Sequence, residues 1–145
     1  MCNENETTRH LEEKLKKIDA QDDVSSFIRK NANKDSSFRE FYSRYIGEKK
    51  VGVPEILKRS CVSRNYIYNI LNGDREPSRD KILALCIAAG MNFAETDRAL
   101  ELAGERRIYP KDERDARIAI MINQGIKDVE DVNMMLESYG LETLK

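Results

Sequence analysis

The sequence has no long apolar run, and it contains only three cysteines and one histidine in 145 residues. A membrane-spanning helix needs roughly 20 consecutive apolar residues, so we expect no membrane partner. The segment 1–14 lacks a basic stretch followed by an apolar one, so no signal peptide is expected. The odd cysteine count, without a Cys-x-x-Cys pair, argues against a disulfide framework or a zinc site. It favours a reduced, cytoplasmic protein in which Cys61 and Cys86 are small buried residues.

Motifs for catalysis and cofactor binding are also missing. The single histidine, His10, lies in a polar segment, and there is neither a Gly-rich phosphate loop nor a His-Glu-x-x-His pair. The acidic cluster of Asp112, Glu113 and Asp115 lacks the spacing of a calcium loop. We interpret this cluster as negative charge at the N-terminus of a helix, where the macrodipole favours it. We therefore expect no enzyme, no catalytic residue, no metal site and no cofactor.

The small net charge of −1 conceals a gradient along the chain. Residues 1–35 carry a net charge of −1, residues 36–81 carry +4, and residues 82–145 carry −4. A basic middle favours an anionic partner there, although chance scatter of charges explains the gradient equally well.

Helix signals recur along the whole chain, and the alternation typical of strands is absent. Apolar residues such as Phe38, Phe41, Tyr42 and Tyr45 follow the helical spacing i, i+3, i+4, i+7. Glycines follow the apolar stretches, and candidate N-caps precede several of them, namely Ser37, Ser78, Asn92, Asp112 and Asp128. The sequence predicts an all-α fold with helices over 6–19, 22–32, 37–48, 53–60, 63–72, 78–89, 93–103, 112–124 and 128–139.

The most informative stretch runs from Val53 to Gly73, where two short helices meet at a tight turn around Cys61 and Val62. Helices of this length are not stable alone, so they must pack on the flanking helices. Their apolar residues predict a buried side, and Val62 can fill the angle between the helices. The buried residues expected in the two helices are Ile56, Leu57, Ile67, Ile70 and Leu71. This layout is typical of a helix-turn-helix, whose second helix presents its N-terminal end to a partner.

The outer face of the second helix carries polar side chains of an unusual kind. Asn65, Tyr68, Asn69 and Asn72 share one stripe, and Arg64 lies four residues before Tyr68. Arg can bind guanine at O6 and N7, and Asn can pair with adenine at N6 and N7. An ordinary solvated face would more often carry Glu and Lys.

The segment from about Ser37 to Gly104 resembles the lambda-repressor-like, Cro/Xre-type helix-turn-helix family. The run 56–63 is similar to that family's second helix and turn, and Gly73 to Ser78 resembles its Gly-x-x-x-Pro-Ser exit. The resemblance implies a five-helix domain that binds double-stranded DNA and acts as a bacterial transcriptional regulator. The Tyr109-Pro110 pair and the later Arg-Asp-Ala triplet resemble the tail of a group of bacterial Xre-like proteins.

The resemblance also implies roles for individual residues. Base reading falls on Arg64, Asn65, Tyr66, Tyr68 and Asn69. Contact with the DNA backbone is expected from residues on and beside the two helices, namely Lys49, Lys58, Ser63, Asn72, Arg75 and Arg79. For Tyr66, packing at the edge of the core is an equally good interpretation.

The chain is expected to divide into three parts. Residues 1–35 form an N-terminal helical extension, residues 36–104 the helix-turn-helix domain, and residues 105–145 a C-terminal helical pair packed on it. The apolar residues expected to place this pair on the core are Ala116, Ala119, Ile120, Val129, Val132, Leu136 and Tyr139.

Two functional hypotheses remain open. The first is sequence-specific binding of double-stranded DNA, with a homodimer on two half-sites. The second is an adaptor that binds a protein partner and reads no DNA. The near-neutral net charge favours the adaptor, as does Pro54, which stands where the family often has Gln or Ser.

Overall fold

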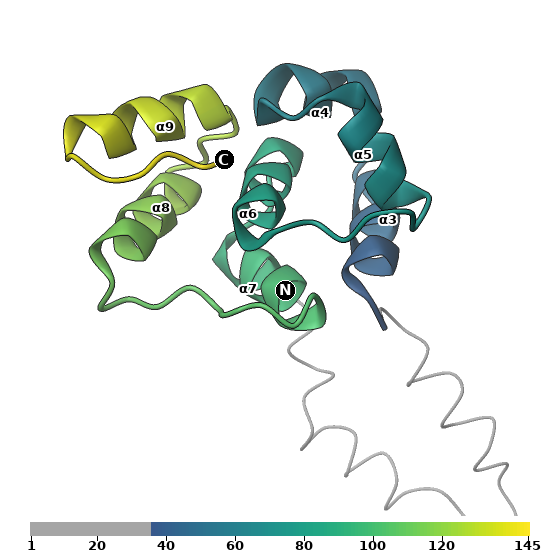
Figure 1. Ribbon diagram of the computed structural model, residues 1–145, viewed down its shortest axis with the longest axis horizontal. Helices are drawn as coiled ribbons and strands as arrows, with labels where there is room; N and C mark the ends of the chain where they lie inside the picture. Colours follow the sequence, from purple (N-terminus) through teal and green to yellow (C-terminus); the bar gives the residue numbers. More distant parts are fainter. Residues whose placement is uncertain (1–35) are drawn as a thin grey trace, which may run out of the picture. The chain divides into compact units, whose positions relative to one another are not determined.

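The computed structural model describes residues 36–145, which form seven α-helices and no strand (Figure 1). The all-α prediction is confirmed for these residues, and every helix predicted among them agrees within one residue at each end. The helices predicted over 6–19 and 22–32 lie outside the described residues. The observed helices are α3 (Phe38–Glu48), α4 (Val53–Ser60), α5 (Arg64–Leu71), α6 (Arg79–Ala89), α7 (Phe93–Leu102), α8 (Glu113–Asn123) and α9 (Val129–Ser138).

Local side-chain hydrogen bonds fix where most of these helices begin. At α7, Asn92 accepts from the Glu95 N–H, and the Glu95 carboxylate accepts from the Asn92 N–H, which completes a capping box. The cap residues whose side chains accept an N–H from the first turn are Ser37, Ser63, Ser78, Asn92, Asp112 and Asp128. The predicted N-caps are therefore confirmed, which explains the agreement in helix bounds.

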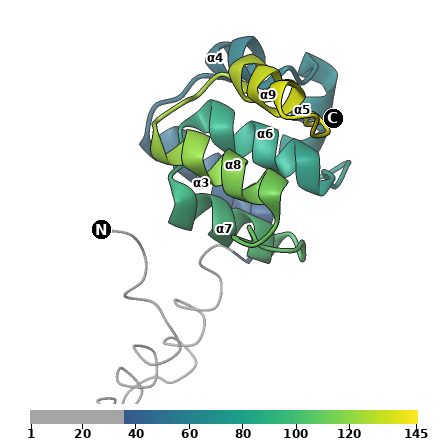
Figure 2. The same cartoon turned by 90° about the vertical axis from the view of Figure 1, so that its left-hand side faces the viewer.

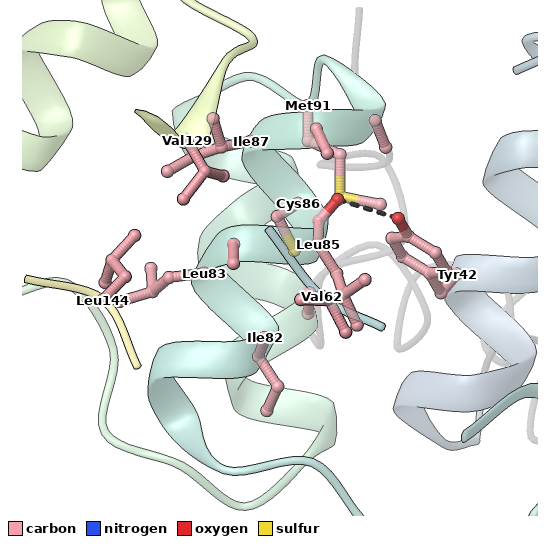
Figure 3. Close-up of a cluster of buried hydrophobic side chains, with 14 of the residues drawn as sticks. Tyr42, Val62, Ile82, Leu83, Leu85, Cys86, Ile87, Met91, Val129 and Leu144 are labelled. Carbon is pink, nitrogen blue, oxygen red and sulfur yellow. Dashed lines mark hydrogen bonds between the residues drawn. The ribbon is translucent and has the colours of Figure 1, made fainter. Parts of the chain in front are cut away.

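Helix α6 is the centre of the core. Every residue from Ile82 to Ala89 is buried, and α4, α7 and α9 all pack against this helix. The Tyr42 hydroxyl of α3 donates a hydrogen bond of 2.8 Å to the Leu85 carbonyl, drawn as a dashed line in Figure 3. Burial raises the pKa of Tyr42 well above its usual value of 10, so its hydroxyl remains a donor. Among residues 36–145, none of the helices has the length and apolar composition that spanning a bilayer requires.

The C-terminal helices share this core, and α8 and α9 lie side by side (Figure 2). Val129, Val132 and Leu136 are buried as expected. The expectation for Ile120 and Tyr139 is wrong, because each is 53% exposed. The buried apolar residues of α8 are instead Ile118 and Ile122, while Ala119 is partly buried and packs against the core as expected.

The wrong face of α8 has a physical reason. Apolar residues occupy nearly every position from 116 to 122, so the apolar pattern alone does not select one face. The buried residues Asp115, Ile118 and Ile122 share one stripe at i, i+3 and i+7. The ion pair of Asp115 therefore helps to orient the helix.

Two ion pairs join the start of α6 to the start of α8. Arg79 pairs with Asp115 at 2.8 Å, and Arg114 pairs with Asp80 at 3.0 Å. Both pairs are bidentate, because each guanidinium contacts both carboxylate oxygens of its partner. We call these four residues the double clasp.

The double clasp also binds backbone groups. Arg79 donates to the carbonyl oxygens of Arg106 and Arg107, and Asp115 accepts from the Tyr109 N–H at 2.9 Å. Burial raises the pKa of Asp115, but the hydrogen bonds from Arg79 and the Tyr109 N–H outweigh it and hold that pKa below its usual value. Asp115 is therefore held as a carboxylate, and the segment before α8 is fixed to α6.

Candidate nucleic-acid interface

The turn between α4 and α5 sets the direction of α5. Cys61 ends α4 in the left-handed region, with φ 58° and ψ 24°. Val62 is buried and lies among the core side chains (Figure 3), and its N–H donates to the buried Ser60 hydroxyl at 3.2 Å. The turn is thus fixed by one apolar residue and one hydrogen bond.

The expectation of a buried Cys61 is wrong, whereas Cys86 is fully buried. Cys61 lies on the outside of the turn because the following residue, Val62, occupies its interior. Partial burial raises the pKa of the Cys61 thiol, and the charges of Glu130 and Asp128 raise it further. The thiol is therefore less reactive than an ordinary exposed cysteine.

Helix α5 has a buried side and an exposed side, as the sequence predicts. Ile67 and Ile70 are 1% and 2% exposed. The outer face of α5, as we call it, consists of exposed polar residues, namely Arg64, Asn65, Tyr68, Asn69 and Asn72. Tyr68 is 41% exposed, so this face also presents an aromatic ring to solvent.

The charge on α5 does not serve its folding. Ser63 caps the helix by accepting the Tyr66 N–H at 3.2 Å, and the first turn holds no acidic residue. Arg64 places a positive charge at the positive end of the helix dipole, where it is unfavourable. Arg64 forms no salt bridge within residues 36–145. The N-terminus of α5 is therefore suited to an anion from outside.

Two cations contact the Tyr66 ring on one flank of α5. The Arg75 guanidinium lies 4.6 Å from the ring centre, and the Lys81 ammonium lies 5.4 Å from it. Both are within the range of a cation–π contact. Lys81 is not among the residues that the sequence points to, because its contact with Tyr66 joins two helices and leaves no spacing signal.

Arg39 of α3 is a second cation that sequence reasoning misses. It lies against Gly73, and a Cβ added there would stand 3.3 Å from an Arg39 guanidinium nitrogen. Gly73 has φ +83°, a backbone conformation that residues other than glycine rarely adopt. Glycine at this position is therefore required by its backbone conformation, and the Arg39 guanidinium packs against it at the end of α5.

The residues expected at a DNA backbone are only partly brought together. Ser63 and Asn72 cap the two ends of α5, and Arg75 follows in the next loop. Lys49 ends α3, with its ammonium 5.8 Å from the Tyr45 ring centre. Lys58 of α4 lines an open depression together with acidic residues, Asp128 and Asp131.

Arg79 requires a correction. Its side chain is only 13% exposed, and its guanidinium is held by Asp115 and by two backbone carbonyls in the double clasp. We therefore assign Arg79 to the interior of the fold and leave it out of the interface. The sequence offers no signal for this, since Asp115 is 36 positions away.

Comparison of the chain with protein-family models, curated proteins and solved structures finds no match.

Proposed function

We propose that this chain binds double-stranded DNA in a sequence-specific manner, with α5 inserted into the major groove. The observation that carries the proposal is the outer face of α5, which exposes an arginine, a tyrosine and three asparagines and no carboxylate. In this proposal α4, the turn at Cys61 and α5 form a helix-turn-helix of the lambda-repressor-like, Cro/Xre type. The protein would then be a transcriptional regulator of the bacterial cytoplasm.

The chemistry of this face matches base edges. A major groove about 12 Å wide admits a helix whose diameter with side chains is about 10–12 Å. Arg64 would bind guanine through two hydrogen bonds, while Asn65 and Asn69 would pair with adenine. Tyr68 would supply an apolar contact or a hydroxyl at the centre of the face.

Backbone contacts would flank these base contacts. Ser63 and Asn72 stand at the ends of α5, and Arg75, Lys49 and Lys58 supply positive charge from the neighbouring segments. One module of this size makes few contacts, so we propose a homodimer on half-sites about one helical turn apart.

Selection of bound sequences from random duplex DNA tests the proposal. We expect an enriched motif, and binding of that motif should weaken steeply as salt rises, because bound phosphates release counterions. Arg64→Glu combined with Asn69→Glu should abolish binding at about 50 mM salt, because two new negative charges in the major groove would be repelled by the phosphates on either side. The fold should persist, because both side chains are exposed.

A matched control changes the net charge by the same amount, but at positions outside α5. Arg98→Glu combined with Asn123→Glu alters exposed positions on α7 and α8. We expect this variant to bind the selected motif nearly as well as the unmodified chain does. Equal loss of binding in both double variants would show that overall charge, rather than the outer face of α5, controls binding.

The adaptor hypothesis is favoured by the charge balance of the described part, in addition to Pro54. Residues 36–145 carry a net charge of zero, and Asp74 and Glu76 lie in the loop directly after α5. An adaptor predicts no duplex binding by the unmodified chain at micromolar protein and about 50 mM salt. That result, on a broad pool of sequences, would replace the DNA proposal with the adaptor.

A further inference from the structure

We infer that Tyr66 positions Arg75 and Lys81 as a pair of phosphate contacts along one flank of α5, and that Tyr66 itself reads no base. The inference rests on the proposed DNA binding and divides the roles within that surface. It removes Tyr66 from the expected base-reading residues and adds Lys81 to the expected backbone contacts.

The position of Tyr66 on α5 is the first argument. Each residue advances about 100° around a helix axis, so positions 64 and 66 lie on opposite flanks of α5. Tyr66 is half-buried and packs against the core, whereas Asn65 and Asn69 are exposed. A base edge facing the outer face of α5 would meet the asparagines, while the Tyr66 ring stays at the flank.

The second argument is how the two cations are anchored. Arg75 follows Gly73 in a loop whose backbone is tied to α5, since the N–H groups of Asp74 and Arg75 both donate to the Asn69 carbonyl. Lys81 stands in the first turn of α6, where its N–H donates to the Ser78 hydroxyl. Two cations from different elements thus converge on one aromatic ring, and both backbones are fixed.

The third argument is the electrostatics of the pair. Within the described part of the chain, neither Arg75 nor Lys81 forms a salt bridge. Two positive charges on one ring repel each other, so a phosphate that contacts both is favoured. The outer face of α5 then has uncharged polar side chains along its centre, Arg64 on one flank and the Tyr66 pair on the other. In a major groove, the flank with the Tyr66 pair would face one phosphate backbone, while the centre of the face and Arg64 at the N-terminal tip would face base edges.

Cation–π contact needs the ring but not the hydroxyl, and this gives a matched pair of variants. Tyr66→Phe should bind the selected duplex as the unmodified chain does. Tyr66→Leu should bind about three- to tenfold more weakly near 100 mM salt, and its plot of log affinity against log salt should be shallower by about one to two phosphate contacts. Its base preference should be unchanged, because no base reader has been removed.

A second variant keeps the test independent of folding. Arg75→Gln combined with Lys81→Gln removes both charges while Tyr66 stays in place. It should reduce the salt slope by about two contacts, and adding Tyr66→Leu to it should change the slope no further. In the free protein, the side-chain protons of Arg75 and Lys81 should show upfield ring-current shifts that persist in Tyr66→Phe.

The outcomes separate this inference from the function on which it rests. If the unmodified chain binds the duplex while the salt slope stays unchanged in both the Tyr66→Leu and the double Gln variants, the inference alone is overturned. A changed base preference in Tyr66→Phe overturns it too, since the hydroxyl would then read a base. If the unmodified chain binds no duplex, the inference and the proposed function fail together.

Discussion

The outer face of α5 and the double clasp use the same kind of side chain in opposite ways. Arg79 and Arg114 are 13% and 18% exposed, and each is held by both oxygens of a carboxylate. Arg64 is exposed, with no salt bridge inside the described part, and it stands where the helix dipole disfavours it. An arginine with no role in folding, at the tip of a helix whose face lacks carboxylates, is the better guide to a partner.

This contrast has a consequence for mutation. Removing a clasp residue should damage stability, and any effect on binding should follow from unfolding. Removing Arg64 should damage binding and leave stability nearly unchanged. The following predictions test the two halves of the contrast.

The largest effect is expected at the clasp. Asp115→Ala leaves the Arg79 guanidinium and the Tyr109 N–H without their partner, so we expect the free energy of unfolding to fall by about 3 kcal/mol. Urea denaturation measures this loss. Glu113→Ala is the matched control, because it removes only an exposed pair with Arg117 and an exposed charge at the helix N-terminus, which together should contribute under about 1 kcal/mol. Similar losses in the two variants would mean that the clasp contributes no more than a surface pair.

The same contribution should depend on pH in one direction. The pKa of Asp115 is lowered in the folded protein from the usual 3.8, so its stabilisation is fully present above that value. This stabilisation should be lost as the pH falls below 3.8 and then through the lowered pKa of Asp115 in the folded protein. The difference in unfolding free energy between the unmodified chain and Asp115→Asn should therefore stay constant from pH 7 to 5 and then narrow in acid. A difference that persists undiminished at pH 2 would exclude this carboxylate as the cause.

A binding effect of about 1–3 kcal/mol is expected from Arg64→Ala on the selected duplex, with weaker discrimination at one base position. The urea denaturation of this variant should match that of the unmodified chain within about 0.5 kcal/mol. Arg75→Ala should instead weaken binding to all duplexes alike. Equal binding by Arg64→Ala and the unmodified chain would refute the base-reading role of Arg64.

The smallest effect, and a gain, is expected at the turn. Cys61 holds a left-handed conformation that is strained for a residue with a side chain, so Cys61→Gly should stabilise the fold by about 0.5–1 kcal/mol. The unfolded chain gains freedom from glycine, which limits the increase. Thermal denaturation measures it, and Cys61→Ala, which keeps the strain, is the control. A loss of stability in the glycine variant would show that the thiol makes a favourable contact.

Local signals explain how much of the fold could be predicted. Caps such as Asn92 and Ser78 act within one turn of their own helix, so their spacing in the sequence is sufficient to place them. The buried side of α5 followed from Ile67 and Ile70 for the same reason, since one helical period relates them. The bounds and inner faces of short helices were therefore predictable.

Contacts between distant segments explain the rest. The role of Arg79 depends on Asp115, and the role of Tyr66 depends on Arg75 and Lys81, which arrive from a loop and another helix. On α8 the pattern of apolar residues allowed two faces, and the buried pair of Asp115 distinguishes them. The spacing of residues within one helix does not show which distant residue a side chain will contact or which of two apolar faces will be buried. Tertiary partners decide it.

The burial of α6 on all sides determines how its backbone N–H groups can become exposed to water. Because eight successive residues from Ile82 to Ala89 are buried, no side of this helix can face water while the rest stays packed. Its backbone N–H groups should exchange with deuterium only when the whole unit from Ser37 to Lys145 opens. The slowest exchange in α6 therefore measures the global free energy of unfolding, whereas the exposed side of α5 reports local opening.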